Sequence, residues 1–449
     1  MKSHIDEFAS KRKPSDYNER LTEELTKLNA EFGAFRMIEP KPKSGFPFSV
    51  KDNICVKSVE STAASAILKG YIPPFSATAV DRLEKAGFAF IGKTNMDEFG
   101  FGTFGLNSDI AARNPIDPLR VAGGSSSGAA IATAVLKYHI ALAESTGGSI
   151  SAPASFCGVV GFTPTYGVVS RYGLIDYANS LDKIGLMARS AVDIEKTFDI
   201  IRGSDMHDST SIDFEASSAR PKRLVVINEL IQNVDESVRI RFNELLDKFR
   251  TFGYDISYSS MPEIKYSIAA YYIISMAEAS TNLARYTGFK YGFKVKDFSK
   301  PYNAFFTEAR KNFGAEAKRR IVLGTFVRGT SVKSRYYDKA LKIRRLLIDK
   351  LKKLLDGAFL ISPTMPITTP TIEEAKRLSV VQTYGLDLLT IPPNLCGFPH
   401  ISVPYDYLDG MPLGAQLIGG HFQDHGVLAL AKFWEKNFEY KFQYNVGEL

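Results

Sequence analysis

Residues 123–128 read GGSSSG and residues 145–149 read STGGS, and an apolar segment, AAIATAVLKYHIALA (129–143), separates them. A single Gly/Ser run can be a flexible linker. Here the segment between the two runs is predicted to be a buried helix (128–137) followed by a strand (139–143). Flexible linkers are not expected on both sides of one buried helix–strand unit. Glycine-rich turns let backbone N–H groups converge on one point, as an oxyanion or a phosphate requires. The pattern therefore predicts a site built from two loops on an α/β framework.

Helical and strand patterns alternate along the rest of the chain, which indicates the α/β class. Residues 1–45 are expected to form a short polar and helical N-terminal segment, and residues 46–449 a single domain. Strands are predicted at 46–50, 88–92, 223–227, 358–362, 400–404 and 412–420, and helices at 21–28, 79–87, 236–252, 337–355 and 427–438.

The composition is that of an ordinary soluble globular protein, with 45% hydrophobic and 23% charged residues among 449. A net charge of +7 does not mark a dedicated nucleic-acid binder, although contact with RNA beside an RNA-binding partner stays possible. Three cysteines without a CxxC pair argue against a disulfide framework or a zinc site, so we expect no metal. The charged N-terminus and the absence of an apolar run of ~18 residues predict a cytoplasmic protein without membrane contact.

The two loops and their surroundings resemble the amidase signature family. The matching stretches are GGSSSGAAIATAV and STGGSISAPASFCGVVGFTPTYG within residues 123–167, and SVKDN at 49–53. The resemblance implies one α/β/α domain around a large mixed central sheet covered by helices on both faces. It also implies a Ser–Ser–Lys set, in which Lys51 is the base, Ser125 is a bridging serine in a cis peptide and Ser149 is the nucleophile. Oxyanion stabilisation would come from the backbone N–H groups around Thr146, Gly147 and Gly148.

The chemistry of amide hydrolysis explains why these residue types are needed. A serine hydroxyl is a weak nucleophile until a base takes its proton. With no histidine in a recognisable triad motif, a lysine base fits, but it must be neutral to act. At a reference pKa near 10.4, roughly 0.04% of lysine is neutral at pH 7, a penalty of about 4.6 kcal/mol. Burial of Lys51 behind an apolar strand is expected to reduce that penalty.

The second loop departs from the family pattern. The family usually has DTGGSIR, whereas this chain has STGGSIS, so Ser145 and Ser151 replace an acid and a base. Losing one member of a buried ion pair leaves an unpaired charge, which destabilises the fold. Losing both members can leave the stability nearly unchanged. We interpret the change as a repacked loop, with a non-catalytic protein as the alternative.

Within the family, the chain most resembles the A subunits of tRNA-dependent amidotransferases, which release ammonia from glutamine. The segments on which this resemblance rests include KRRIVLGTF (318–326) and LLTIPPNLCGFPHISVP (388–404). The resemblance implies that Arg320 holds the glutamine α-carboxylate, that Asp387 holds its α-ammonium, and that Tyr271 or Tyr272, with Tyr272 preferred, lines the pocket. It implies no cofactor in this chain, B and C partner subunits with ATP and Mg on B, and a misacylated Glu-tRNA(Gln) or Asp-tRNA(Asn) that reaches the complex.

Three other functions remain open at this point. A stand-alone amidase would hydrolyse simple amides and ignore glutamine. A non-catalytic scaffold protein would form no covalent adduct at Ser149. An RNA-binding module would bind RNA tightly and with a steep salt dependence.

Overall fold

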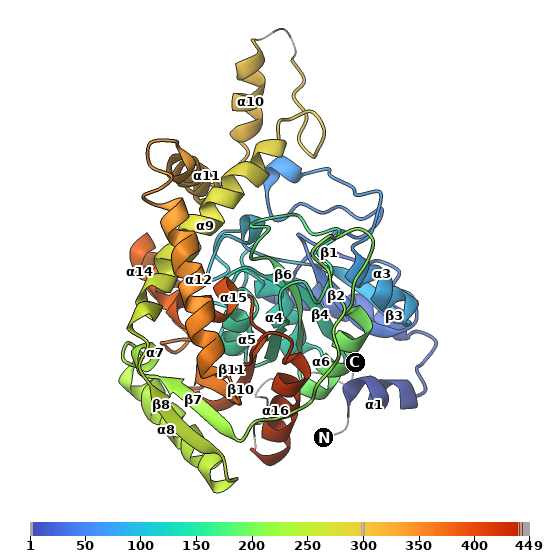
Figure 1. Cartoon of the computed structure of the whole chain (residues 1–449). Coiled ribbons are helices and arrows are strands. Elements are labelled where there is room, and N and C mark those ends of the chain that lie inside the picture. Colours follow the sequence, from blue (N-terminus) through green and yellow to red (C-terminus); the bar gives the residue numbers. More distant parts are fainter. Residues whose placement is uncertain (1–2, 298, 300, 439, 441, 443–449) are drawn as a thin grey trace.

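One eleven-stranded mixed sheet organises the computed structural model, which describes residues 3–297, 299, 301–438, 440 and 442 (Figure 1). The strand order is β1-β3-β2-β4-β6-β5-β10-β11-β9-β7-β8. The predicted α/β class with a large mixed sheet is thus confirmed. The strands are β1 (Phe35–Ile38), β2 (Phe46–Lys51), β3 (Phe88–Thr94), β4 (Ile140–Ser145), β5 (Val160–Thr163), β6 (Lys183–Ala188), β7 (Arg223–Ile227), β8 (Asp255–Ser259), β9 (Ala358–Pro363), β10 (His400–Leu408) and β11 (Met411–Ile418).

Helices lie around this sheet and join its strands. The α-helices are α1 (His4–Ser10), α2 (Tyr17–Phe32), α3 (Thr78–Lys85), α4 (Ser127–Val135), α5 (Ser151–Cys157), α6 (Ala191–Ile201), α7 (Asn228–Ile231), α8 (Glu236–Thr251), α9 (Ser267–Asn282), α10 (Tyr302–Arg310), α11 (Ala315–Arg328), α12 (Tyr337–Leu354), α13 (Ile372–Arg377), α14 (Val380–Gly385), α15 (Ile391–Cys396) and α16 (Asp424–Asn437). Short 3-10 helices are η1 (Ala66–Leu68), η2 (Glu98–Gly100), η3 (Pro262–Tyr266), η4 (Leu283–Arg285) and η5 (Leu386–Leu388).

Two groups of helices pack on the sheet. Helices α4 and α5 contact each other and the central strands, whereas α6 contacts α3, α16 and β6. All nine residues of α4 are buried, as its run of alanines requires. Gly128 allows α4 to begin close to the neighbouring backbone, because a Cβ there would lie 2.1 Å from the Ala34 carbonyl oxygen. Small residues therefore hold α4 tightly behind the loops that flank it.

The N-terminal segment is part of the same packing. β1 pairs antiparallel with β3, and the apolar side chains of α1 and α2 join the main hydrophobic core. The expected division at residue 45 thus falls between β1 and β2, which belong to one sheet. Asp193 on α6 accepts hydrogen bonds from the Ser3 hydroxyl at 2.6 Å and the Ile5 N–H at 3.1 Å, which ties α1 to the middle of the chain.

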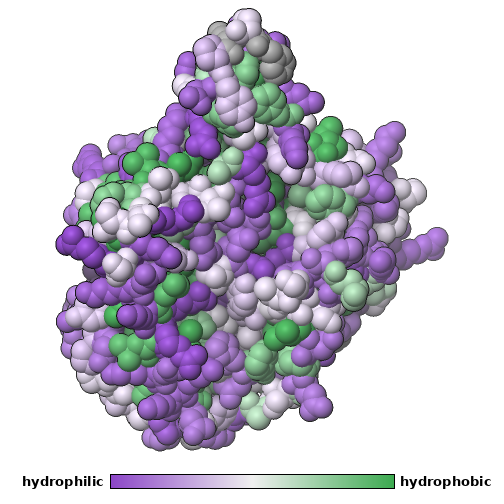
Figure 2. Space-filling view, turned by 45° about the horizontal axis from the view of Figure 1, so that its top comes forward, coloured by the Kyte–Doolittle hydropathy of each residue, from purple (hydrophilic) through white to green (hydrophobic). Residues whose placement is uncertain are grey.

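The hairpin of β10 and β11 joins two halves of the sheet. β10 pairs with β5 of the first half, and β11 pairs with β9 of the second, both antiparallel. The helices α9, α11 and α12 pack together at one side of the sheet, and α10 projects from the body of the molecule (Figure 1). In Figure 2, apolar side chains on the visible face lie in small patches among polar ones. Among the described residues, no helix combines the length and apolarity needed to cross a membrane.

Candidate active site

Lys51 and Ser125 meet in the buried centre of the molecule. Lys51 ends β2 with no exposed surface, and its Nζ donates to Ser125 Oγ at 2.8 Å. Ser125 follows a cis peptide bond from Gly124, and its carbonyl oxygen accepts the N–H of Asp97. The lysine and the serine predicted to work together, 74 residues apart, are thus in direct contact.

Ser149 lies on the second loop, at the edge of the same centre. The residue is 7% exposed, and its carbonyl oxygen accepts the N–H of Ser126 at 3.3 Å, which joins the two Gly/Ser loops. Ser149 lines a small cavity of about 20 Å³ together with Gly124 and Gly147. That volume holds about one water molecule, so an amide that reaches Ser149 requires the surrounding side chains to move apart.

The glycines of the second loop allow a close approach by its neighbours. A Cβ on Gly147 would lie 2.4 Å from the Tyr271 ring, and one on Gly148 would lie 2.4 Å from Thr390 Oγ1. The N–H of Gly148 donates to Ser145 Oγ at 3.3 Å. Of the predicted oxyanion donors, Gly148 therefore already has a partner with which a substrate oxygen would compete.

Sequence reasoning missed Glu144, which lies one residue before the STGGS loop. Its carboxylate Oε2 accepts from Lys51 Nζ at 2.9 Å, and its carbonyl oxygen accepts from the same Nζ at 3.0 Å. The side chains of both residues are buried, at 0% exposure for the lysine and 1% for the glutamate. The signal was an acidic residue within an apolar strand, ALAES, because such a residue is seldom buried without a cationic partner.

The replaced acid and base of the second loop occupy buried positions. Ser145 Oγ donates to Asn394 Oδ1 at 3.3 Å, and Ser151 Oγ has no hydrogen-bond partner among the described residues. Neither serine carries a charge, so the replacement leaves no buried ion without a partner at these two positions. The repacked loop remains an interpretation.

The three predicted substrate-binding residues line the same small cavity as Ser149. Tyr272 donates to Asp387 Oδ2 at 2.6 Å, and the Thr103 hydroxyl donates to the same carboxylate at 3.2 Å. Arg320 is 4% exposed; its Nε donates to Glu316 Oε1 at 2.8 Å and its Nη1 donates to the Tyr177 hydroxyl. A cation and an anion therefore face one cavity.

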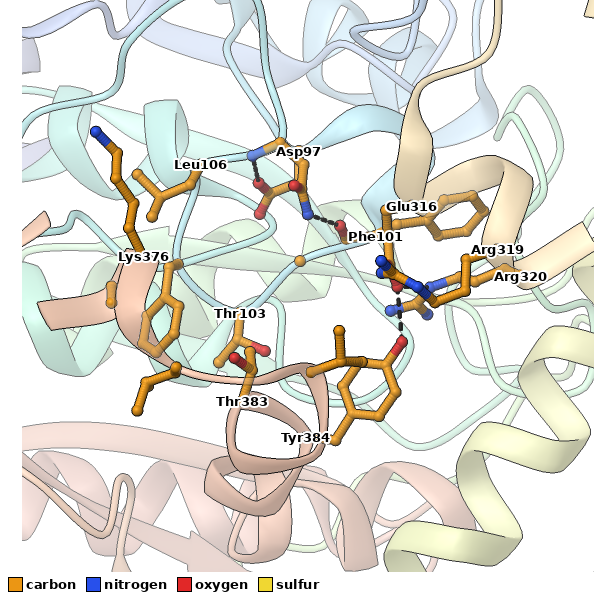
Figure 3. Close-up of a pocket in the computed structure, with 16 residues that line it drawn as sticks. Asp97, Phe101, Thr103, Leu106, Glu316, Arg319, Arg320, Lys376, Thr383 and Tyr384 are labelled. Carbon is orange, nitrogen blue, oxygen red and sulfur yellow. Dashed lines mark hydrogen bonds and ion pairs between the residues drawn. The ribbon is translucent and has the colours of Figure 1, made fainter. Parts of the chain in front are cut away.

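Figure 3 shows a second, larger pocket of about 320 Å³. It shares the lining residues Gly102, Thr103 and Arg320 with the small cavity. Tyr384 closes one side, stacks on Tyr272 with ring centroids 3.8 Å apart, and donates to Glu316 at 2.7 Å. The remaining lining residues are Asp97, Phe101, Phe104, Leu106, Asn107, Arg319, Ala375, Lys376, Leu378, Val380 and Thr383. The larger pocket therefore adjoins the inner cavity.

Asp97 lies between this pocket and the first loop. It accepts the N–H groups of Gly105 at 3.1 Å and of Asn107 at 2.7 Å. Burial raises the pKa of Asp97 to about 7, although these hydrogen bonds act in the opposite direction. Through these two hydrogen bonds, the Asp97 carboxyl holds the backbone at Gly105 and Asn107, in the loop that precedes Ser125.

Residues 9–428 match the model of the amidase family. The chain belongs to this family. The A subunit of glutamyl-tRNA(Gln) amidotransferase from Archaeoglobus fulgidus is 44% identical over 402 residues, which cover 88% of this chain and 86% of that relative. Its counterpart from Sulfolobus acidocaldarius is 37% identical over 455 residues and covers 95% of both chains.

Two solved structures have the same fold as this chain. The crystal structure of the A subunit of glutamyl-tRNA(Gln) amidotransferase from Thermotoga maritima has a TM-score of 0.80 and 34% identity, and covers 96% of this chain and 94% of its own. A 6-aminohexanoate cyclic dimer hydrolase in complex with its substrate has a TM-score of 0.82 at 22% identity, and covers 97% and 96%. The second likeness shows the fold alone. Which amide this chain hydrolyses must therefore be argued from the residues of its pocket.

Proposed function

We propose that this amidase hydrolyses glutamine and supplies the ammonia to a tRNA-dependent amidotransferase as its A subunit. The observation that carries the proposal is the cavity in which Ser149, Arg320 and Asp387 meet, beside the contact of Lys51 with Ser125. The similarity to the A subunits of Archaeoglobus and Sulfolobus supports the same assignment.

In the proposed reaction, Ser149 Oγ attacks the side-chain amide carbon of glutamine. Ser125 takes the proton of Ser149 as it passes its own to Lys51, and the carbonyl π electrons move onto oxygen. Backbone N–H groups of Thr146 and Gly147 would stabilise the oxyanion, with Gly148 joining if it releases Ser145. The C–N bond then breaks, the proton returns through Ser125 to the leaving nitrogen, and water hydrolyses the glutamyl-enzyme.

The proposed partners are a B subunit that holds ATP and Mg and a small C subunit, with misacylated tRNA bound by the complex in the cytoplasm. The chain's own site needs no cofactor for the steps above. The direct test is to co-express this chain with the B and C subunits of its own genome and to supply amide-¹⁵N glutamine with Glu-tRNA(Gln) or Asp-tRNA(Asn). Appearance of ¹⁵N in the amide of the tRNA-bound product supports the proposal. Purification without partners, together with hydrolysis of simple amides but not of glutamine, would favour a stand-alone amidase instead.

Glutamine specificity is predicted to depend on Arg320 and Asp387. Free glutamine carries an α-carboxylate and an α-ammonium, which a simple aliphatic amide lacks. Because hydrogen bonds to charged groups contribute about 1.5–3 kcal/mol each, Arg320→Ala or Asp387→Ala should lower kcat/KM for glutamine by roughly 10- to 150-fold. Hydrolysis of a small uncharged amide should change little.

The control for this comparison is Arg345→Ala, which removes a 75% exposed arginine on α12 that pairs with Asp349 and lies outside the pocket lining. Its kcat/KM for glutamine should stay near that of the wild type. Equal losses toward glutamine and the uncharged amide in the Arg320 or Asp387 variants would mean that these residues are structural.

The affinity for glutamine is also predicted to depend on pH. Burial raises the pKa of Asp387 to about 6, against the opposing effect of the bond from Tyr272. The carboxyl is protonated below that pH and can no longer pair with an ammonium, so KM for glutamine should rise as the pH falls through about 6. In Asp387→Asn, KM should be high and flat over the same range. A wild-type KM without a rise near this pH would contradict the role of Asp387.

A further inference from the structure

Glu144 lies against both Lys51 and Ser125. Its Oε2 accepts from Lys51 Nζ at 2.9 Å and from Asn53 Nδ2 at 3.2 Å. Gly100 closes this space, since a Cβ there would lie 3.4 Å from Glu144 Oε2 and 3.5 Å from Ser125 Oγ. The carboxylate is therefore fixed against the proposed base at the point where that base contacts the bridging serine.

The contacts of Lys51 match the protonated form of its amine. Nζ has three acceptors, which are Ser125 Oγ, the Glu144 carbonyl oxygen and Glu144 Oε2, and an ammonium has three N–H groups. Such a lysine cannot act as a base until it loses a proton. Moving that proton to Glu144 Oε2 would leave two neutral groups and no unpaired buried charge, whereas moving it to water would leave a lone carboxylate in the centre of the protein.

A second carboxyl indicates that Glu144 is the anion of this cluster. Thr146 Oγ1 lies 2.6 Å from Glu144 Oε1 and 2.8 Å from Asp182 Oδ1. A hydroxyl has one proton, so one of the two carboxyls must itself donate. Burial, followed by the charge of Glu144, raises the pKa of Asp182 well above its usual range. Asp182 therefore donates to Thr146, and Thr146 donates to Glu144.

We propose, on the basis of the glutaminase function above, that Glu144 is a positioning residue that accepts a proton from Lys51 before the attack and returns it afterwards. In the resting enzyme the pair is an ammonium and a carboxylate. The proton moves from Nζ to Oε2, and the lone pair of Lys51 then takes the proton of Ser125 as Ser125 takes that of Ser149. The Oγ–C bond forms and the carbonyl π electrons move onto oxygen.

The second half of the step restores the pair. The oxyanion collapses, the C–N bond breaks, and the ammonium of Lys51 gives a proton through Ser125 to the leaving nitrogen. Glu144 then returns its proton to Lys51. Ammonia and an acyl-enzyme have formed, the ammonium and carboxylate are restored, and no proton has been exchanged with water.

Glu144→Gln tests this role because it keeps the size of the side chain and removes its charge. In the complex with the partner subunits, kcat at saturating glutamine and neutral pH should fall roughly 100-fold, with KM within about twofold. The acid limb of the kcat–pH profile is the range of low pH over which kcat falls. In Glu144→Gln it should move to higher pH by about one unit or more, because Lys51 must now lose its proton to water. Glu144→Asp, which keeps a carboxyl, should retain the wild-type position of the limb even if its rate is lower.

The other ionisable groups around the pair are Asp97, Asp176, Asp182 and Arg320, and their side chains are unchanged in these variants. Loss of the Glu144 charge removes one cause of the raised pKa of Asp182, so Asp182 should titrate at lower pH in Glu144→Gln and cannot account for a limb displaced to higher pH. Glu435→Gln is the matched control, because this glutamate on α16 accepts the Ala191 N–H at 2.8 Å, away from the site. Its profile should be that of the wild type.

The outcomes separate three roles for Glu144. An acid limb displaced to lower pH in Glu144→Gln would mean that Glu144 only stabilises the cationic form of Lys51. An unchanged acid limb would mean that Glu144 has a structural role. Either result would overturn the proposal. The pH dependence of Ser149 sulfonylation by phenylmethanesulfonyl fluoride, followed by mass spectrometry, adds a readout without glutamine. If wild type does not hydrolyse glutamine but the sulfonylation limb moves up in Glu144→Gln, the proton role stands and the substrate assignment fails.

Discussion

Ser149→Ala is expected to abolish glutamine hydrolysis while the chain stays folded. The hydroxyl is the only group removed, and Ser149 is held through its backbone, whose carbonyl oxygen accepts the Ser126 N–H. Loss of a nucleophile in a serine hydrolase costs about 10⁶-fold in kcat. Ammonia release from glutamine, measured by a coupled glutamate dehydrogenase assay, should therefore fall to background.

The control for this variant is Ser155→Ala, which alters a buried serine on the neighbouring helix α5 whose hydroxyl accepts the Gly414 N–H. This variant should keep its activity apart from any loss of stability. Retention of more than a few per cent of wild-type turnover by Ser149→Ala would show that another residue is the nucleophile.

Lys51→Ala is expected to lower kcat by several orders of magnitude, because proton transfer and activation of the nucleophile fail together. Lys51→Arg should not restore activity, since a guanidinium stays protonated at every accessible pH. Stopped assays with radiolabelled glutamine can follow such slow turnover. An active arginine variant would contradict a mechanism that requires a neutral base.

The structure adds a control for folding to this experiment. Removing Lys51 alone leaves Glu144 as a buried, unpaired charge, which destabilises a protein by about 3–5 kcal/mol. The double variant Lys51→Met, Glu144→Gln removes both charges, so its melting temperature should recover toward that of the wild type. Its activity should not recover. Recovery of activity together with stability would show that Lys51 acts only through the fold.

Much of the fold could be predicted because the relevant strands are short apolar runs between clear breaks. Strand β7 (Arg223–Ile227) has the predicted bounds, and α4 and β4 lie within one or two residues of theirs. The strands that the periodicity did not reveal include β1, β5, β6 and β8. These strands have four to six residues and no sustained alternation, and they are strands because a neighbour pairs with them.

Part of the candidate site could likewise be predicted from the sequence, and part could not. The residue types and loops were readable because Gly/Ser runs on both sides of an apolar segment are rare, and the contact of Lys51 with Ser125 agrees with the predicted set. The catalytic and substrate-binding roles themselves stay predictions. Glu144 could not be assigned from sequence alone, because only the pairing of β2 with β4 brings the lysine and the glutamate together. Likewise, only the three-dimensional structure shows that Arg320 is buried and that Glu316, its partner, is partly buried.

The position of β10 and β11 has a consequence for how this protein is made. The ribosome releases the chain from its N-terminus at about 5–20 residues per second, and domains begin to form as they emerge. Strands β5 and β9 each have an unpaired edge until residues 400–418 emerge, because the hairpin of β10 and β11 is what lies between them. Open edges of this kind favour association with other chains. The two halves of the sheet thus stay apart during synthesis until residues 400–418 have emerged, and recombinant yields should respond to chaperones that shield nascent strands.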